Sequence, residues 1–279
     1  MKYDEINNII EISGVKDFHP VHTFLCGQCF RWIQNDDGSF DGVAYGKGVN
    51  ISQNGDTLII KNTNIEDYET IWKNYLDLDR DYTSVKTLLS SDKNLKKAIE
   101  YGYGIRILNQ EPWECLVSFI ISTQNQIPRI KKIVSAICEK YGDEIKIDDR
   151  VYYTFPDAGR LKGVCEDQLA FLKAGYRAGY IVDAVNKVLS GEINLDKIFD
   201  MDYIDAKKEL MKIKGVGEKV ADCVLLFSYG KTEAFPIDVW VGRIMRGLYL
   251  NENATIKEIR LESEKLFGKN AGIAQQYLL

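Results

Sequence analysis

The pattern of apolar and polar positions changes near residue 100. Before that point, short β-branched or aromatic runs alternate with turn signals such as D-D-G, Y-G-K-G and Q-N-G-D; the runs are C-F-R-W, S-F-D-G-V-A-Y, V-N-I-S and T-L-I-I-K. Such runs predict antiparallel strands joined by hairpins. After Tyr101, apolar residues recur at helical spacing in longer segments, at 112–125, 128–141, 166–173, 177–190, 205–213, 218–228, 239–249, 255–267 and from about 270.

Strands followed by helices predict an α+β chain. We expect an N-terminal antiparallel β-sheet domain over residues 1–100, packed on a mostly α-helical core over residues 101–279. No Ser/Gly/Pro-rich linker and no internal repeat separates the two parts. The parts are therefore expected to pack on each other.

Composition is that of an ordinary soluble globular protein, with 45% hydrophobic and 28% charged residues. The N-terminus lacks a signal peptide and no apolar run approaches the roughly 18 residues of a membrane span, so we expect a cytoplasmic protein with no membrane contact. Its six cysteines are expected to stay as thiols there.

The net charge of −5 argues weakly against nucleic acid as a partner, because binding to phosphates draws on a positive surface. A local basic patch on an acidic protein is nevertheless sufficient. Two clusters could form one: Arg129 with Lys131 and Lys132, and the lysines at 207, 208, 212, 214 and 219. A lysine cluster alone more often indicates a solvated helix face.

A zinc site is the first alternative to consider. The stretch H-P-V-H-T-F-L-C-G-Q-C holds His19, His22, Cys26 and Cys29, four ligand types that zinc accepts. The segment runs directly into the strand-like F-R-W and lacks the longer insert that closes such a site. No βαβ pattern surrounds the C-x-x-C, so a thioredoxin-like role is not favoured either. We predict no metal ligands here.

Residues 212–223 read K-I-K-G-V-G-E-K-V-A-D-C and carry the strongest motif. Gly215 and Gly217 supply a tight turn between two helices, and the N-terminus of the second helix offers an anion site. The spacing is neither a P-loop nor a dinucleotide-binding fingerprint. It fits a helix-hairpin-helix at about 205–228, which binds DNA backbone, although a plain helix-turn-helix packing unit has the same spacing.

Lys219 lies one helical turn from Cys223 and borders the apolar face of its helix. It is either a snorkelling lysine or a partly desolvated amine that acts as a nucleophile. Asp238 follows Pro236 and precedes an apolar-periodic run, which predicts the N-cap of the next helix. A fixed carboxylate near an amine nucleophile would also stabilise a cationic transition state, such as that of glycosidic cleavage.

These residues resemble a known family. G-V-G-E-K-V-A-D-C followed by F-P-I-D-V-W is similar to the helix-hairpin-helix DNA glycosylases with a lysine nucleophile, specifically the 8-oxoguanine DNA glycosylase/AP lyase family. Three more stretches agree: C-G-Q-C-F-R-W, S-F-I-I-S-T-Q-N-Q-I-P-R-I and A-G-Y-R-A-G-Y-I. The resemblance implies a base-excision repair enzyme in which Lys219 attacks C1′ of a flipped nucleotide, forms a Schiff base and permits β-elimination, while Asp238 stabilises positive charge.

The resemblance also implies a set of base-recognition residues. The backbone carbonyl of Gly27 would accept the N7–H that distinguishes 8-oxoguanine from guanine. Cys223 would pack against the flipped base, and Gln275 would read its pairing edge. Leu279 stands where the family places an aromatic residue on the far face of the base.

On the opposite strand, the family fills the vacated stack with an asparagine and holds the orphaned cytosine with two arginines. Arg129 and Arg177 match those arginines, and Tyr176 matches the neighbouring wedge. Gln124 stands at the asparagine position with Asn125 beside it, which puts opposite-base discrimination in question.

The same resemblance predicts that no cofactor is required and, because no cysteines follow Cys223, that there is no iron–sulfur cluster. A structural cation held by hairpin carbonyls near Met211, Ile213 and Val216 is a candidate by analogy. The expected partner is double-stranded DNA containing 8-oxoguanine, bound by a monomer that associates with the nucleoid. The alternatives are a glycosylase of the same superfamily for another lesion, such as alkylated purines, and a non-catalytic protein that binds DNA backbone.

Overall fold

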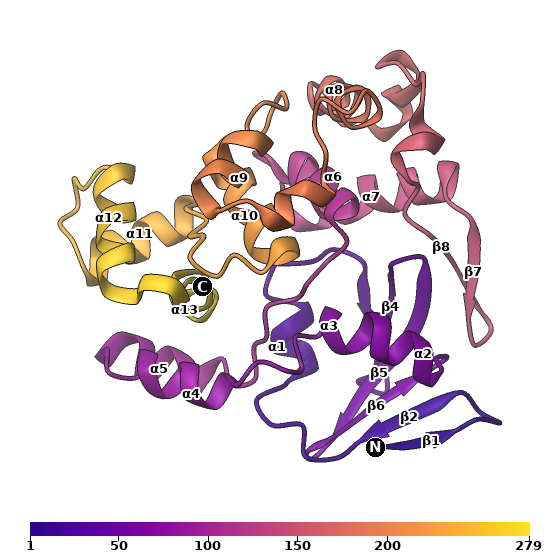
Figure 1. Cartoon of the computed structure of the whole chain (residues 1–279), viewed down its shortest axis with the longest axis horizontal. Coiled ribbons are helices and arrows are strands. Elements are labelled where there is room, and N and C mark those ends of the chain that lie inside the picture. The colour runs from indigo at the N-terminus through magenta and orange to yellow at the C-terminus, as the bar shows by residue number, and fades with distance from the viewer.

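A computed structural model describes all 279 residues and confirms the α+β class, with a sheet followed by a mostly helical core (Figure 1). The sheet is antiparallel with the strand order β1-β2-β6-β5-β4-β3. Its strands are β1 Lys2–Asp4, β2 Ile9–Ile12, β3 Trp32–Gln34, β4 Phe40–Ala44, β5 Lys47–Asn54 and β6 Thr57–Lys61.

Tight turns fix the register of the central strands. Tyr45 and Gly46 join β4 to β5, and both have positive φ (51° and 69°), as a type I′ hairpin turn requires. Gly55, at φ 59°, opens the two-residue turn between β5 and β6. Val49 and Ile51 of β5 and Leu58 and Ile60 of β6 are fully buried. They form one hydrophobic core with Phe24 of α1 (Pro20–Phe24) and Trp72.

From Ile65 to Tyr101 the chain is helical, where its pattern had suggested further strands. The segment contains α2 Ile65–Asp67, a π-turn at Tyr68–Trp72, α3 Lys73–Tyr75, α4 Tyr82–Leu89 and α5 Lys93–Tyr101. Asp81 and Asp92 cap α4 and α5 by accepting backbone N–H groups of the first turn. These helices are too short to show a clear helical period of apolar residues. The aspartates that cap α4 and α5 were the sequence signal for a helix start.

The second half is built from eight longer helices close to the predicted segments. They are α6 Pro112–Ser122, α7 Ile127–Tyr141, α8 Arg177–Leu189, α9 Tyr203–Leu210, α10 Glu218–Tyr229, α11 Val239–Leu248, α12 Ile256–Phe267 and α13 Ala271–Leu278. The remaining 3-10 turns are Ala158–Leu161, Asp167–Leu172, Asp196–Asp200 and Gly268–Asn270, and the hairpin β7 Glu144–Ile147 with β8 Arg150–Tyr153 was not predicted. Buried α6 and α10 cross at the centre, where the Phe119 and Phe227 rings stack at 5.5 Å.

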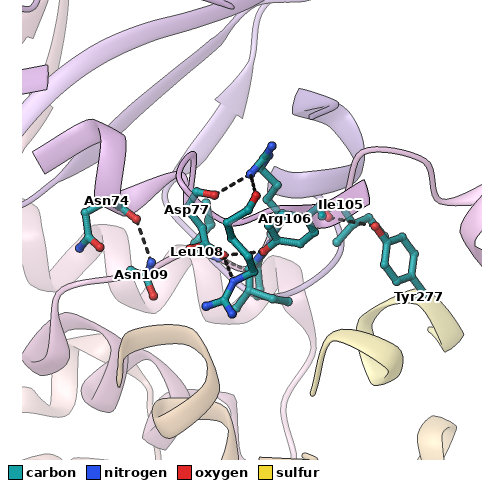
Figure 2. Close-up of polar contacts among 11 residues, drawn as sticks. Asn74, Asp77, Ile105, Arg106, Leu108, Asn109 and Tyr277 are labelled. Atoms are coloured by element: carbon teal, nitrogen blue, oxygen red, sulfur yellow. Dashed lines mark hydrogen bonds and ion pairs between the residues drawn. The ribbon is translucent and has the colours of Figure 1, made fainter. Parts of the chain in front are cut away.

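The segment from Gly102 to Gln110 ties the two halves together (Figure 2). Arg106 is buried and donates to the backbone carbonyls of Asp77 at 2.5 Å and Lys16 at 2.7 Å. The Tyr277 hydroxyl donates to the carbonyl of Ile105 at 3.2 Å, which anchors α13 to this segment. α13 also contacts the loop after α1, where Cys26 meets Gln276 across a separation of 250 residues. None of the helices combines the length and hydropathy that a membrane crossing requires.

Candidate active site

A cavity of about 980 Å³ lies where α1, α10, α11 and α13 meet. Its size is at the upper end of the range for small-molecule sites. The residues that line it include Asn125 and six others predicted from the sequence as catalytic or base-recognition residues: Gly27, Lys219, Cys223, Asp238, Gln275 and Leu279. The six come from four separate parts of the chain, so the fold brings the predicted chemistry to one place.

Lys219 begins the cavity wall in the first turn of α10. Its Nζ lies 5.3 Å from the ring centroid of Phe119, over the aromatic face. Cys223 follows one turn later and is buried. Burial raises the pKa of the Cys223 thiol to about 11, although the neighbouring Lys219 works against the rise. The thiol is therefore neutral at pH 7, and the amine is the polar group that this helix presents to the cavity.

Asp238 caps α11, as its position after Pro236 predicted. Its Oδ1 accepts the backbone N–H of Val241 at 2.8 Å, and the residue has extended backbone at φ −97°. The N-terminus of a helix favours an ionised carboxylate. Asp238 lines the same cavity as Lys219, so the cap also places a negative charge in the cavity wall.

Gly27 has a left-handed backbone at φ 89°, and a Cβ built on it would meet no atom within 4 Å. The loop is held by Gln28, whose Nε2 donates to the carbonyls of Thr23 at 2.9 Å and Arg106 at 2.8 Å. The Gln28 Oε1 accepts the N–H of Leu108 at 2.9 Å. The buried glutamine thus fixes a glycine whose conformation other residues rarely adopt.

A second hollow of about 680 Å³ lies between the helical hairpin and the loop before α7. Gln124 and Tyr176 meet at its edge, where the Tyr176 hydroxyl donates to Gln124 Oε1 at 3.3 Å. Gln124 has a left-handed backbone at φ 47°. Asn125, the next residue, instead lines the larger cavity. The structure therefore brings the two predicted stack-filling residues together and separates Asn125 from them.

The two predicted arginines differ in their surroundings. Arg177 is 5% exposed, and its guanidinium donates to the carbonyls of Thr123, Gln124 and Ala174. Arg129 is exposed and makes one contact, from Nη2 to the carbonyl of Lys173 at 2.7 Å. Arg177 therefore holds the loop that presents Gln124, a role that the sequence did not indicate. Arg129 lies at the surface.

The helical hairpin has the geometry that its glycines predicted. Gly215 has φ 80°, and a Cβ there would lie 2.1 Å from the Tyr180 ring, so both conformation and space exclude a side chain. Gly217 is the N-cap of α10 and provides no side-chain acceptor for the first N–H groups of that helix. Uncapped N–H groups at a helix N-terminus form an anion site.

The lysines around the hairpin are less available than the sequence suggested. Lys207 pairs with Asp222 at 3.0 Å, Lys208 with Asp205 at 3.0 Å and Lys212 with Glu209 at 2.6 Å. Three of the five lysines are therefore paired with acids, Lys208 and Lys212 with neighbours in sequence and Lys207 with an acid on α10. This leaves the α10 N-terminus itself as the main candidate for phosphate contact.

Asp222 is a buried acid that the sequence analysis missed. It is 0% exposed and accepts from the Tyr203 hydroxyl at 2.6 Å and from Arg260 Nη1 at 2.9 Å, in addition to Lys207. The pairing joins α9, α10 and α12 directly behind the turn that carries Lys219. Its signal was a charged residue inside the apolar run V-A-D-C-V-L-L-F, since a buried charge requires partners.

Trp240 was also missed. It is 63% exposed in the first turn of α11, lines the cavity beside Asp238, and lies under the guanidinium of Arg243 at 5.0 Å. A large exposed aromatic side chain at the rim of a cavity is typical of a binding surface. Its proximity to Asp238 in sequence was the available signal.

The zinc alternative lacks a ligand set. The His19 and His22 rings stack at 4.1 Å, and His19 Nδ1 accepts the backbone N–H of His22. Cys26 and Cys29 are free thiols, and nowhere in the structure do three or more His, Cys, Asp or Glu side chains converge as metal ligands. The C-x-x-C pair instead flanks Gly27.

Comparison with known proteins agrees with this geometry. Residues 11–116 match the N-terminal domain of 8-oxoguanine DNA glycosylase, and residues 117–269 match the HhH-GPD superfamily of base excision DNA repair proteins. A probable N-glycosylase/DNA lyase of Methanothermobacter thermautotrophicus is 33% identical over 222 residues, which are 72% of this chain and 70% of the relative.

Solved structures are more similar still. MBOgg1 in complex with a low-affinity DNA ligand is 48% identical with a TM-score of 0.96, over 100% of this chain and 97% of that one. The Clostridium acetobutylicum 8-oxoguanine glycosylase/lyase, in complex with double-stranded DNA containing cytosine opposite 8-oxoguanine, is 40% identical with a TM-score of 0.93 over the same shares. The chain belongs to the HhH-GPD superfamily of base excision DNA repair proteins and, within it, to the 8-oxoguanine DNA glycosylase/AP lyase family.

Proposed function

We propose that this protein removes 8-oxoguanine from duplex DNA through a covalent Lys219 intermediate and then cleaves the strand at the abasic site. One observation carries the proposal. An amine, a carboxylate and a left-handed glycine line a single cavity beside an uncapped helix N-terminus. The cavity is recessed below the protein surface, so a nucleotide of duplex DNA would have to leave the base stack to enter it.

Base excision begins with attack of the lone pair of Lys219 Nζ on C1′ of the flipped nucleotide. The N9–C1′ bond breaks, its electron pair leaves with the base, and the base takes up the proton that the newly bonded lysine nitrogen loses. Positive charge develops at C1′ and O4′ in the transition state. The Asp238 carboxylate, held in place by its bond to the Val241 N–H, stabilises that charge.

Strand cleavage follows from the same covalent bond. The C1′–O4′ bond opens as O4′ takes a proton, which leaves a protonated imine between C1′ and Lys219. The imine acidifies C2′, so loss of a C2′ proton expels the 3′ phosphate oxygen by β-elimination. Water then hydrolyses the imine and releases the lysine.

Lesion recognition is proposed to rest on Gly27, Cys223 and Gln275. Oxidation at C8 converts N7 of guanine from an acceptor into an N–H donor, and the carbonyl of Gly27 is an acceptor in the cavity wall. Cys223 and Leu279 offer apolar contacts for the ring, and Gln275 offers an amide for its pairing edge. The Clostridium acetobutylicum relative of 40% identity supports this substrate, since it is named for it.

For the opposite strand, we propose that Gln124 and Tyr176 fill the vacated stack and that Arg129 reaches the orphaned cytosine. Arg177 acts by holding the carbonyls of Thr123 and Gln124. Gly215 and Gly217 shape the hairpin that receives the adjacent backbone phosphate. The enzyme is proposed to act as a monomer on nucleoid DNA.

A hairpin cation receives limited support. The carbonyl of Ile213 already accepts the N–H of Val216. The Lys187 ammonium lies 2.5 Å from the carbonyl of Lys212, the residue between Met211 and Ile213 in the sequence. A neighbouring ammonium opposes a second cation. A cation at the carbonyls of Met211, Ile213 and Val216 stays a proposal through which no step of the reaction runs.

Borohydride trapping tests the lysine mechanism. Reduction of the imine on an 8-oxoguanine duplex is expected to crosslink native protein to DNA, and Lys219→Gln is expected to form no crosslink. Lys2→Gln, at an exposed lysine of β1 that does not line the cavity, serves as the matched control and is expected to trap like native protein. An undiminished crosslink in Lys219→Gln would exclude this lysine as the nucleophile.

A panel of lesions tests the substrate. Excision of 8-oxoguanine with little release of alkylated purines supports the proposal, whereas the reverse order assigns the protein to another lesion. Binding without release of any base, and with equal affinity for damaged and undamaged duplex, would identify a non-catalytic DNA-backbone binder.

A further inference from the structure

We propose that Asp183 and Lys187 of α8 are positioning residues for base flipping. They hold the turn of the helical hairpin at a fixed distance from Gln124 and Tyr176. The inference rests on the proposed function, in which Gln124 and Tyr176 fill the vacated stack while the hairpin receives the backbone phosphate. The sequence analysis placed neither Asp183 nor Lys187 in the site.

One face of α8 carries a stripe of four residues that points at the hairpin side of the helix. Their spacing is four, three and four residues, which aligns them on one side: Tyr176, Tyr180, Asp183 and Lys187. The Tyr176 and Tyr180 rings meet at 5.4 Å, and both line the hollow beside the hairpin. The other side of α8 is buried in the main core through Ile181, Ala184 and Val185. The helix is therefore fixed in rotation and presents the stripe in one direction.

The hairpin turn is fastened to this stripe through its backbone. Asp183 Oδ2 accepts the N–H of Lys214 at 2.8 Å, and the Lys187 ammonium donates to the carbonyl of Lys212 at 2.5 Å. The two side chains also pair with each other at 3.5 Å and are only 15% and 21% exposed, so water competes little for these bonds. Gly215 of the same turn leaves no room for a Cβ because the Tyr180 ring fills that space.

The first turn of α8 fastens the other DNA-contacting loop. Arg177 donates to the carbonyl of Thr123 at 2.8 Å and to that of Gln124 at 2.9 Å, and the Tyr176 hydroxyl donates to the Gln124 side chain. Seven residues separate Tyr176 from Asp183, a rise of about 10 Å along an α-helix. One stretch of regular helix thus sets the distance between the stack-filling pair and the hairpin turn.

Lys219 is held by different contacts. Asp222, one turn further along α10, binds the Tyr203 hydroxyl of α9 and the guanidinium of Arg260 of α12. Loss of the bonds from α8 would therefore free the hairpin turn while α10 keeps its place. The two attachments can be tested separately.

A fixed distance matters when a base pair has to be opened. Side chains that enter the stack push the duplex away from them, and the pair opens only if the backbone is held in place meanwhile. The energy of unpairing is smallest for a base that has no pairing partner. The contribution of Asp183 and Lys187 should therefore be large for a paired lesion and small for an unpaired one.

The test compares single-turnover excision of 8-oxoguanine placed opposite cytosine with excision of 8-oxoguanine placed opposite an abasic-site analogue, at saturating protein. We expect Asp183→Ala to lower the rate opposite cytosine by about tenfold, the effect of one hydrogen bond to a charged group, and the rate opposite the analogue by less than about threefold. A ratio of the two rates equal to that of native protein would overturn the proposal, because a loosened fold or a displaced Lys219 lowers both rates together.

Conservative variants identify the bond that is responsible. Asp183→Asn keeps an oxygen that can accept the Lys214 N–H and is expected to retain most of the native ratio, whereas a shift as large as that of Asp183→Ala would overturn the role of this bond. Lys187→Met keeps the length of the stem without the donor and is expected to shift the ratio in the direction of Asp183→Ala. Asp205→Ala is the matched control, since it removes an exposed carboxylate paired with Lys208 in the same hairpin, and it is expected to keep the native ratio.

The outcomes separate this inference from the proposed function. If native protein releases no 8-oxoguanine from either duplex, the function itself fails. If native protein releases it and neither Asp183→Ala nor Lys187→Met changes the ratio, only the positioning role fails. Thermal unfolding of each variant is measured in parallel. If Asp183→Ala does not fold, Lys187→Met carries the comparison, because it leaves the bond between Asp183 and the Lys214 N–H in place.

Discussion

Gly27 combines a left-handed backbone with open space where a side chain would begin. Gly27→Ala meets no steric obstacle, yet an L-residue at φ 89° is strained by about 1–2 kcal/mol. We expect the loop to relax and its carbonyl to move, with a loss of about tenfold in the preference for 8-oxoguanine over guanine. Competition binding with the two duplexes measures this preference. Unchanged discrimination would show that the carbonyl is not the N7 acceptor.

One substitution separates the N-cap role of Asp238, which the structure shows, from its proposed role in stabilising positive charge. Asn is as good an N-cap as Asp, so Asp238→Asn can keep the hydrogen bond from the Val241 N–H while removing the charge. We expect the free energy of unfolding to change by less than about 0.5 kcal/mol, while single-turnover base excision falls by about 10²-fold or more. Urea unfolding and excision kinetics on the same samples test this. A large loss of stability with little loss of rate would make Asp238 a cap alone.

Residues with local partners were predictable, and residues with distant partners were not. Cys223 follows from helical spacing to Lys219, and Asp238 follows from Pro236 and the run after it. By contrast, the partners of Asp222 include Arg260 on another helix, and Cys26 meets Gln276 across a separation of 250 residues. Periodicity carries no information about which buried polar groups will pair across the fold.

At the scale of elements, α6 is capped by Glu111, a carboxyl group whose negative charge is made unfavourable by burial. Glu111 accepts the Glu114 N–H as the N-cap, and burial, reinforced by the nearby Glu114, raises the pKa of Glu111 to about 7. The folded state therefore binds this proton more tightly than the unfolded state does. Its contribution to stability is complete below about pH 4.5 and is lost as the pH rises through 7.

Glu111→Gln removes that dependence while its amide oxygen can still cap the helix. The free energy of unfolding of the variant relative to native protein should rise by about 2–3 kcal/mol between pH 4.5 and pH 8. Urea unfolding at both pH values measures the change, with Glu5→Gln at an exposed position as the control. A constant difference between variant and native protein at the two pH values would contradict the assignment.

The long periodic helices from α6 to α13 were predicted within a few residues, because each presents an apolar stripe to a shared core. The short elements were not. The segment at 166–173 forms a 3-10 turn rather than an α-helix, and α2 to α5 occupy residues where strands were expected. The β7–β8 hairpin draws its stability from outside itself: Arg150 and Tyr152 bind the Asp41 carboxylate on β4. The order of apolar and polar residues within the hairpin gives no indication of these contacts with β4.

At the scale of the whole molecule, the order of strands and helices predicted the α+β class, while the domain boundary at residue 100 stays a prediction. The sequence did not indicate how the two halves join. The Gly102–Gln110 segment does this by hydrogen bonds to both sides, from Tyr75 and Asn74 near the sheet to Phe227 and Tyr277 in the helical core. Most of these bonds involve backbone groups, which any sequence provides.

The arrangement of the cavity also constrains when it can exist during synthesis. Its wall takes Gly27 from the beginning of the chain, Lys219 and Asp238 from the last quarter, and Gln275 from α13. Domains fold as the ribosome releases them, N-terminal parts first. The sheet can therefore assemble early on the ribosome, but Lys219 has no complete pocket around it until α13 has emerged.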